Sequence, residues 1–211
     1  MRRSGILFAF MVVVGAGGVV MAQDQADQPV PIVPDEAELR RLAEAEAWRL
    51  STGAAAIAKL AKLSQQMNAS EPESSFDAAT AAAVTSWVGI SGTGPSNGAQ
   101  VEALTAKIIN TTSGRPAPAV EWSNSCGEPS NNACYRPSTH TIYLPDKFRT
   151  SSASCQRNVL FHEYTHALAG TKDHVDHGDC NPLDPTIAAC ITGLTCALGS
   201  STGDDCGHPC P

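Results

Sequence analysis

The chain has 211 residues and a formal net charge of −7, because 21 aspartates and glutamates outnumber 14 lysines and arginines. This length suits one compact domain with a sizeable core. The acidic balance argues against nucleic acid or an anionic membrane surface as the main partner. Beyond the N-terminal segment no apolar stretch is long enough to span a bilayer, so we expect no membrane association of the mature protein.

The first 22 residues have the pattern of a secretory signal peptide. Arg2 and Arg3 form a positive start, residues 6–20 are apolar, and Val20 and Ala22 are small residues at the positions that signal peptidase reads. We therefore expect residues 1–22 to be removed and the mature protein to be secreted or periplasmic. An uncleaved membrane anchor is the alternative.

Residues 23–115 form a predicted helical N-terminal region. Asp35 is typical of a helix N-cap with an acidic first turn, and helical spacing of apolar residues then continues to about Met67. The pair Thr52-Gly53 is a candidate break that would divide this stretch into two helices.

Two more Ala-rich helices are predicted over residues 75–88 and 100–109, separated by a loop of glycine, serine and proline over 92–98. The amphipathic helices of this region are interpreted as a scaffold. A removable propeptide is the alternative.

Residues 116–211 are predicted to contain strands as well as a helix. Strands are predicted over 120–123 and 139–144, and a helix over 155–169 that Gly170 ends. Thr141–Leu144 is either an edge strand along which a peptide adds or an ordinary strand of the sheet. The fold class is therefore α+β, with a small sheet beside Ala-rich helices.

Eight cysteines lie in this C-terminal part of the chain. In an exported protein an even number predicts up to four disulfides, and Cys126 with Cys134 would close a short loop. A structural zinc held by Cys206, His208 and Cys210 is the alternative. The cysteines are Cys126, Cys134, Cys155, Cys180, Cys190, Cys196, Cys206 and Cys210.

The predicted helix over 155–169 contains the motif H-E-x-x-H, formed by His162, Glu163 and His166. Histidines four residues apart lie on one face of a helix, so both imidazoles can bind one metal ion. In this motif the glutamate faces the water on the metal and acts as general base. The residues His162 to His166 therefore predict a zinc site with Glu163 as the catalytic residue.

The third protein ligand of the zinc must come from a residue outside the motif. The sequence lacks the residues that supply this ligand in two large classes of zinc peptidase. Glu163 is the last glutamate of the chain, so a downstream glutamate ligand is impossible. The pattern H-E-x-x-H-x-x-G-x-x-H would need glycine and histidine where Ala169 and Lys172 stand, and no methionine follows Met67 to form a Met-turn.

Two families of zincin metallopeptidases resemble what remains. Residues 173–178, Asp-His-Val-Asp-His-Gly, are similar to the D-H-x-x-H-G stretch of the SprT-like group, and this resemblance implies His177 as the ligand. Residues 170–173, Gly-Thr-Lys-Asp, resemble the G-T-x-D of the aspzincins, which implies Asp173. The Tyr-Gly that follows in aspzincins is His177-Gly178 here.

We predict His162, His166 and His177 as the metal ligands, because imidazole is a better zinc donor than carboxylate. His174 and Asp173 are the alternatives. The resulting hypothesis is a zincin-like zinc metalloendopeptidase that binds one catalytic Zn²⁺ and hydrolyses a peptide or protein substrate. The alternative is a secreted binding or structural module in which His174 and His177 both complete a closed, non-catalytic zinc site.

Overall fold

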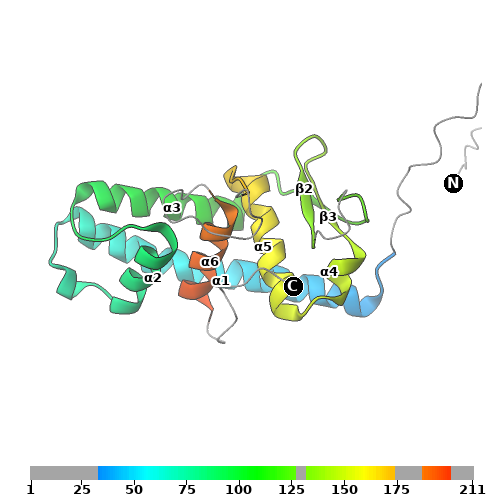
Figure 1. Cartoon of the computed structure of the whole chain (residues 1–211), viewed down its shortest axis with the longest axis horizontal. Coiled ribbons are helices and arrows are strands. Elements are labelled where there is room, and N and C mark those ends of the chain that lie inside the picture. The colour runs from blue at the N-terminus through cyan, green and yellow to red at the C-terminus, as the bar shows by residue number, and fades with distance from the viewer. Residues whose placement is uncertain (1–32, 127–131, 174–186, 201–211) are drawn as a thin grey trace, which may run out of the picture.

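The structure is a computed structural model, and it describes residues 33–126, 132–173 and 187–200. The predicted signal peptide, His174, His177, Cys180 and the three cysteine and histidine residues of the 206–210 stretch lie outside these ranges. Within them the fold is α+β, with six α-helices, one short 3₁₀ helix and a three-stranded sheet. Helix α1 runs along most of the molecule, with the other long helices packed along its middle and one end and the sheet beside its other end (Figure 1).

Helix α1 spans Glu36–Asn68 without interruption, so the predicted break at Thr52-Gly53 is wrong. Its N-cap is Asp35 as predicted, in a reciprocal capping box with Glu38. Gly53 lies instead where α1 packs closely against helix α3 (Pro95–Ser113): a Cβ atom at Gly53 would come within 2.2 Å of Thr112 Cγ2. The glycine permits a close approach of two helices and does not end one.

The first of the next two helices begins later than predicted, and the second extends beyond its predicted range at both ends. A 3₁₀ helix at Glu73–Ser75 precedes α2, which spans Ala78–Val88. Helix α3 spans Pro95–Ser113 and is longer than predicted, because Pro95 is its first residue and the preceding loop is shorter.

One hydrophobic core joins the N-terminal helices to the two long C-terminal helices, α5 (Ala153–Ala169) and α6 (Ala188–Gly199). Phe161 of α5 is fully buried in this core and meets Trp48 of α1 edge to face, with ring centroids 6.3 Å apart. Residues 36–113 therefore pack directly on the helix that carries the H-E-x-x-H motif. Buried members of the core include Leu60, Leu63, Met67, Val84, Val101, Ile108, Phe161, Ile191 and Leu194.

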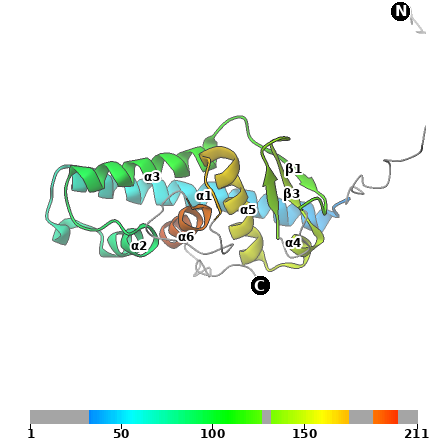
Figure 2. The same ribbon diagram turned by 45° about the horizontal axis from the view of Figure 1, so that its top comes forward.

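The sheet consists of β1 (Ala119–Trp122), β2 (Cys134–Arg136) and β3 (Thr141–Leu144) in the order β1-β3-β2. β3 runs parallel to β1 and antiparallel to β2, so it is the central strand. Of the two interpretations of Thr141–Leu144, the ordinary strand of the sheet is therefore confirmed, and β1 and β2 are the edge strands within the described residues. Figure 2 shows α5 between the sheet and the helical end of the molecule.

Two helices were not predicted from the sequence. Helix α4 spans only Asp146–Thr150, and α6 is apolar on almost every side because nearly all of its residues are buried. A helix buried all round has no amphipathic period to detect. Its close packing is visible at Gly193, where a Cβ atom would come within 2.3 Å of the Trp87 ring.

The predicted pair Cys126–Cys134 forms a disulfide, with Cα atoms 5.5 Å apart. The other described cysteines, Cys155, Cys190 and Cys196, are not free. Among the described residues, no helix combines the length and the apolar character that a membrane span requires.

Candidate metal centre

The H-E-x-x-H residues lie on the second half of α5, which has well-formed ends. Ser152 caps the N-terminus through a hydrogen bond from Cys155 N–H to its hydroxyl, and Gly170 ends the helix in the left-handed region at φ 62°. The turn at Gly170 reverses the chain, so that residues 171–173 return alongside the last turns of the helix. The predicted cap at Gly170 is confirmed.

Three side chains converge on one point at this end of α5: His162, His166 and Asp173. The two histidine Nε2 atoms are 3.1 Å apart, and Asp173 Oδ1 lies 2.9 Å from His162 Nε2 and 3.2 Å from His166 Nε2. The imidazole rings meet nearly edge to face, with centroids 4.7 Å apart.

The donor set and its spacing fit a zinc ion. With zinc–ligand bonds of about 2.05 Å and tetrahedral angles, neighbouring ligand atoms should be about 3.3 Å apart. The observed separations of 2.9 to 3.2 Å are close to this value. Two imidazoles and one carboxylate supply three protein ligands and leave a fourth position for water or substrate, the arrangement of catalytic zinc sites.

Electrostatics reinforce the cluster. Hydrogen bonds with His162 and His166 hold the pKa of Asp173 well below its usual range. Burial lowers the pKa of His166, but the hydrogen bonds with Asp173 and the Thr171 carbonyl outweigh that effect, and the net pKa is raised. Both shifts follow from the pairing of the Asp173 carboxylate with the two imidazoles.

Glu163 lies next to this cluster but is buried, with 7% of its surface exposed. Burial raises the pKa of its carboxyl group, while the neighbouring histidines and a hydrogen bond from the backbone of Tyr135 oppose the rise. The contact with Tyr135 places the carboxylate against edge strand β2. No pattern in the sequence indicated this contact, because it depends on how β2 packs on α5.

The opposite face of α5 is fastened to the N-terminal helices. Tyr164, the first variable residue of the motif, is buried and hydrogen-bonded to Glu46 of α1, as expected of a core rather than a catalytic residue. The guanidinium of Arg49 lies 4.0 Å from the centroid of the Tyr164 ring and donates to the carbonyl oxygens of Thr111 and Thr112 on α3. The face of α5 that carries the cluster is thereby oriented by α1 and α3.

The structure thus brings together His162, His166 and Asp173, with Glu163 beside them. The preferred sequence prediction for the third ligand, His177, lies outside the described residues, as does His174. Asp173, an alternative on the sequence alone, occupies the ligand position that the described residues show.

Thr165 and Thr171 also lie beside this group: their hydroxyl oxygens are 2.6 Å apart, and the Thr171 hydroxyl is 3.2 Å from His166 Nδ1. No local pattern in the sequence indicates these contacts, because they depend on the turn at Gly170. Another histidine, His140, lies outside the H-E-x-x-H motif. It accepts from Tyr135 or donates to it at 2.8 Å through Nδ1 and contacts the Pro116 carbonyl at 3.0 Å through Nε2.

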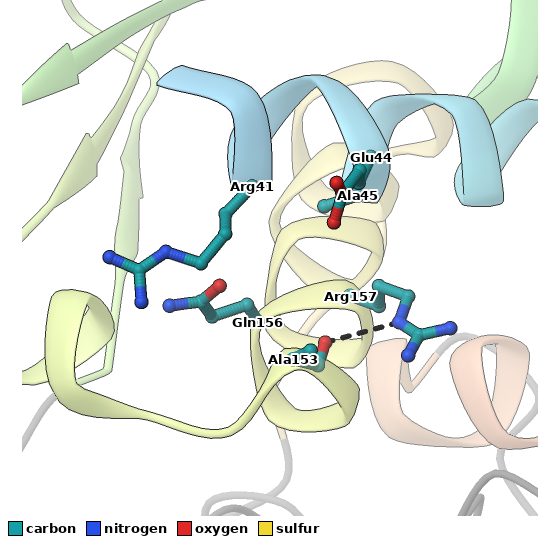
Figure 3. A pocket seen from close by; sticks show the side chains of 6 residues that line it. All are labelled: Arg41, Glu44, Ala45, Ala153, Gln156 and Arg157. Carbon is teal, nitrogen blue, oxygen red and sulfur yellow. Dashed lines mark hydrogen bonds between the residues drawn. The ribbon is translucent and has the colours of Figure 1, made fainter. Parts of the chain in front are cut away.

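A cavity of about 280 Å³ lies elsewhere, between α1 and the first turns of α5. Figure 3 shows Arg41 and Glu44 entering from α1, and Gln156 and Arg157 from α5. None of the four residues of the candidate site lines it. The chemistry expected at the H-E-x-x-H motif is therefore separate from this cavity.

No protein-family model, no curated protein and no solved structure matches this chain.

Proposed function

We propose that this protein is a zinc-dependent metallopeptidase of the zincin class, active in a secreted or periplasmic setting. The observation that carries the proposal is the convergence of His162, His166 and Asp173 on one point, with buried Glu163 beside it on the same helix. The Cys126–Cys134 disulfide is consistent with a site outside the cytoplasm.

The proposal gives each residue a role. A bound zinc ion would polarise the scissile carbonyl and lower the pKa of a water molecule. Glu163 would accept a proton from the attacking water and deliver it to the leaving amine nitrogen. Its buried position, where desolvation raises the pKa of the carboxyl group, makes it a stronger base than an exposed glutamate.

Asp173 replaces His177 as the proposed third ligand, because Asp173 Oδ1 lies within 3.2 Å of both histidine Nε2 atoms. The matched variants are Asp173→Asn and His177→Asn, each compared with the parent chain by zinc content after dialysis. We expect the first to lose zinc and the second to retain it. Loss of zinc only in the His177 variant would restore the original prediction.

Edge strand β2 is the proposed docking line for an extended peptide, in place of β3. A substrate can add a strand only at a free edge of a sheet, and β3 is paired on both sides. The backbone of Tyr135 in β2 already reaches Glu163, so a peptide along this strand would lie next to the proposed base.

The decisive experiment measures hydrolysis of a peptide library by the parent chain and by Glu163→Gln, with zinc content determined for both. We expect the parent to cleave, and the variant to hold zinc without cleaving. Exposed Glu44→Gln serves as the charge-matched control and should cleave normally. If the parent holds zinc and does not cleave, the site is a closed or structural one. If it holds no zinc, the metal centre itself is refuted.

A further inference from the structure

We propose that Thr165 and Thr171 are positioning residues of the metal centre, in that their hydroxyl groups form a clasp that fixes the tautomer of His166 and the place of Asp173. This inference rests on the proposed function. Thr165 Oγ1 and Thr171 Oγ1 lie 2.6 Å apart, both in buried residues, directly behind the converging ligands. Neither hydroxyl belongs to the ligand set.

The protons of this network can be assigned one after another. Thr165 Oγ1–H donates to the His162 carbonyl at 2.8 Å, so its oxygen is left as an acceptor for Thr171 Oγ1–H. The oxygen of Thr171 then faces His166 Nδ1 at 3.2 Å, and the Thr171 carbonyl faces the same nitrogen at 3.0 Å. A carbonyl oxygen only accepts, so Nδ1 must carry the hydrogen.

The hydrogen on Nδ1 determines what the other ring nitrogen of His166, Nε2, can bind. A neutral imidazole with its hydrogen on Nδ1 has its lone pair on Nε2, and His166 Nε2 is the atom that faces Asp173 and His162. The Thr171 carbonyl therefore selects the tautomer that can bind a metal ion at this point, and the hydroxyl clasp holds that carbonyl against Nδ1. In known metal sites, partners of this kind orient the ligand ring and raise its basicity.

The same clasp places the segment that carries Asp173. Thr171 N–H donates to the Thr165 carbonyl at 3.3 Å, which closes the turn at Gly170. On the other side Lys172 pairs with Ile187 in a single β-bridge, and its carbonyl accepts from Ala188 N–H at 2.8 Å. Residues 171–173 are thus held between α5 and the start of α6, with the threonine clasp on the α5 side.

A merely structural role for these hydroxyls is the competing explanation, and the chain offers a control for it. Thr195 of α6 is also fully buried, and its hydroxyl donates to the Ile191 carbonyl at 2.7 Å, four residues back in its own helix. Replacing Thr195 by valine removes a buried helical hydroxyl without touching the metal centre. Thr165→Val is the same substitution and removes a buried helical hydroxyl within the clasp.

The experiment compares Thr165→Val, Thr171→Val, the double variant, Thr165→Ser and Thr195→Val. The first readout is the Zn²⁺ dissociation constant from competition with a chromogenic chelator. The second is the tautomer of His166 in the metal-free protein, from long-range ¹H–¹⁵N spectra at alkaline pH. Circular dichroism confirms that each variant is folded.

We expect each clasp valine to weaken zinc binding by about 10- to 100-fold. Because the clasp no longer holds the Thr171 carbonyl against Nδ1, each valine variant should also populate the second His166 tautomer. The double variant should lose no more zinc affinity than the weaker-binding single variant, because both single variants remove the same hydrogen bond between the two threonines. Thr165→Ser restores the hydroxyl and should bind like the parent, and Thr195→Val should change neither readout.

The clasp is refuted if Thr165→Val keeps the parent dissociation constant and tautomer, or if Thr195→Val weakens zinc binding as much. A parent chain that binds no zinc refutes the clasp together with the proposed function. A parent that binds zinc, shows the expected clasp effects and does not cleave peptides refutes only the peptidase. Cleavage by the parent with zinc binding unchanged in the clasp variants refutes only the clasp.

Discussion

Arg49→Met tests whether the N-terminal helices are part of the fold that holds the metal centre. The Arg49 side chain is buried at the junction of three helices, where it pairs with Glu46 of α1 and donates to the last-turn carbonyls of α3. Its guanidinium also lies against the Tyr164 ring of α5. Methionine has a similar length and apolar stem but can make none of these polar contacts.

The expected loss follows from the groups that remain. The carbonyl of Thr111, a fully buried residue, and the partly exposed carboxylate of Glu46 both lose their cation. Hydrogen bonds to a charged group contribute about 1.5–3 kcal/mol each, and the ion pair with the partly exposed Glu46 carboxylate adds about 1 kcal/mol or less. These contributions overlap, so we expect the free energy of unfolding to fall by about 4 kcal/mol. For a chain of this size that corresponds to a drop in Tm of about 8–16 °C.

The assay is thermal unfolding followed by circular dichroism, with Arg40→Met as the control. Arg40 lies on the same helix with 73% of its side chain exposed, and its ion pair with Glu44 is 3.9 Å long. Such a pair contributes less than about 1 kcal/mol. If Arg49→Met had the same Tm as Arg40→Met and the parent, α1 would not be joined to α5 as described. The interpretation of the N-terminal helices as a propeptide would then regain support.

Three other perturbations have defined outcomes. Gly193→Ala should lower the free energy of unfolding in urea by about 1–3 kcal/mol, because the new methyl group meets the Trp87 ring; an unchanged midpoint would contradict this packing of α6. Asp77 is the N-cap of α2, and its hydrogen bonds with Thr80 lower the pKa of its carboxyl group from 3.8. The stability that the ionised carboxylate contributes is therefore present above pH 3.8 and is lost as the pH falls through the folded-state pKa. Asp77→Ala should therefore reduce Tm at pH 7 and reduce it less at pH 3, whereas equal reductions would show that the carboxylate charge is not involved. Zn²⁺ at 100 times its dissociation constant should raise the free energy of unfolding by about 2.7 kcal/mol, and a chelator should reverse the rise; a parent chain that melts identically with and without Zn²⁺ would contradict the metal centre.

Local patterns were sufficient where the deciding interactions are local. The capping box at Asp35, the glycine cap at Gly170 and the Cys126–Cys134 loop each involve residues close in sequence, and the structure contains all three. The helical spacing of His162 and His166 belongs to the same class, because two residues four apart on a helix must share a face.

Errors arose where burial or packing overrides a local signal. Gly53 has the low helix propensity of any glycine, but its close contact with Thr112 keeps it inside an unbroken α1. Helix α6 shows no amphipathic period because it is enclosed by other helices. Whether Thr141–Leu144 lies at an edge depends on β2, a strand of three residues with no alternation long enough to detect.

The sequence by itself determined that His162 and His166 share one face of a helix with Glu163 next to them, because residues four apart on a helix must lie on the same face. Only the tertiary structure decided which residue completes that face and what orients it. Asp173, Thr171 and the backbone of Tyr135 reach α5 through a reversed turn and a packed strand. Their positions depend on contacts between separate elements, which the order of residues along the chain does not display.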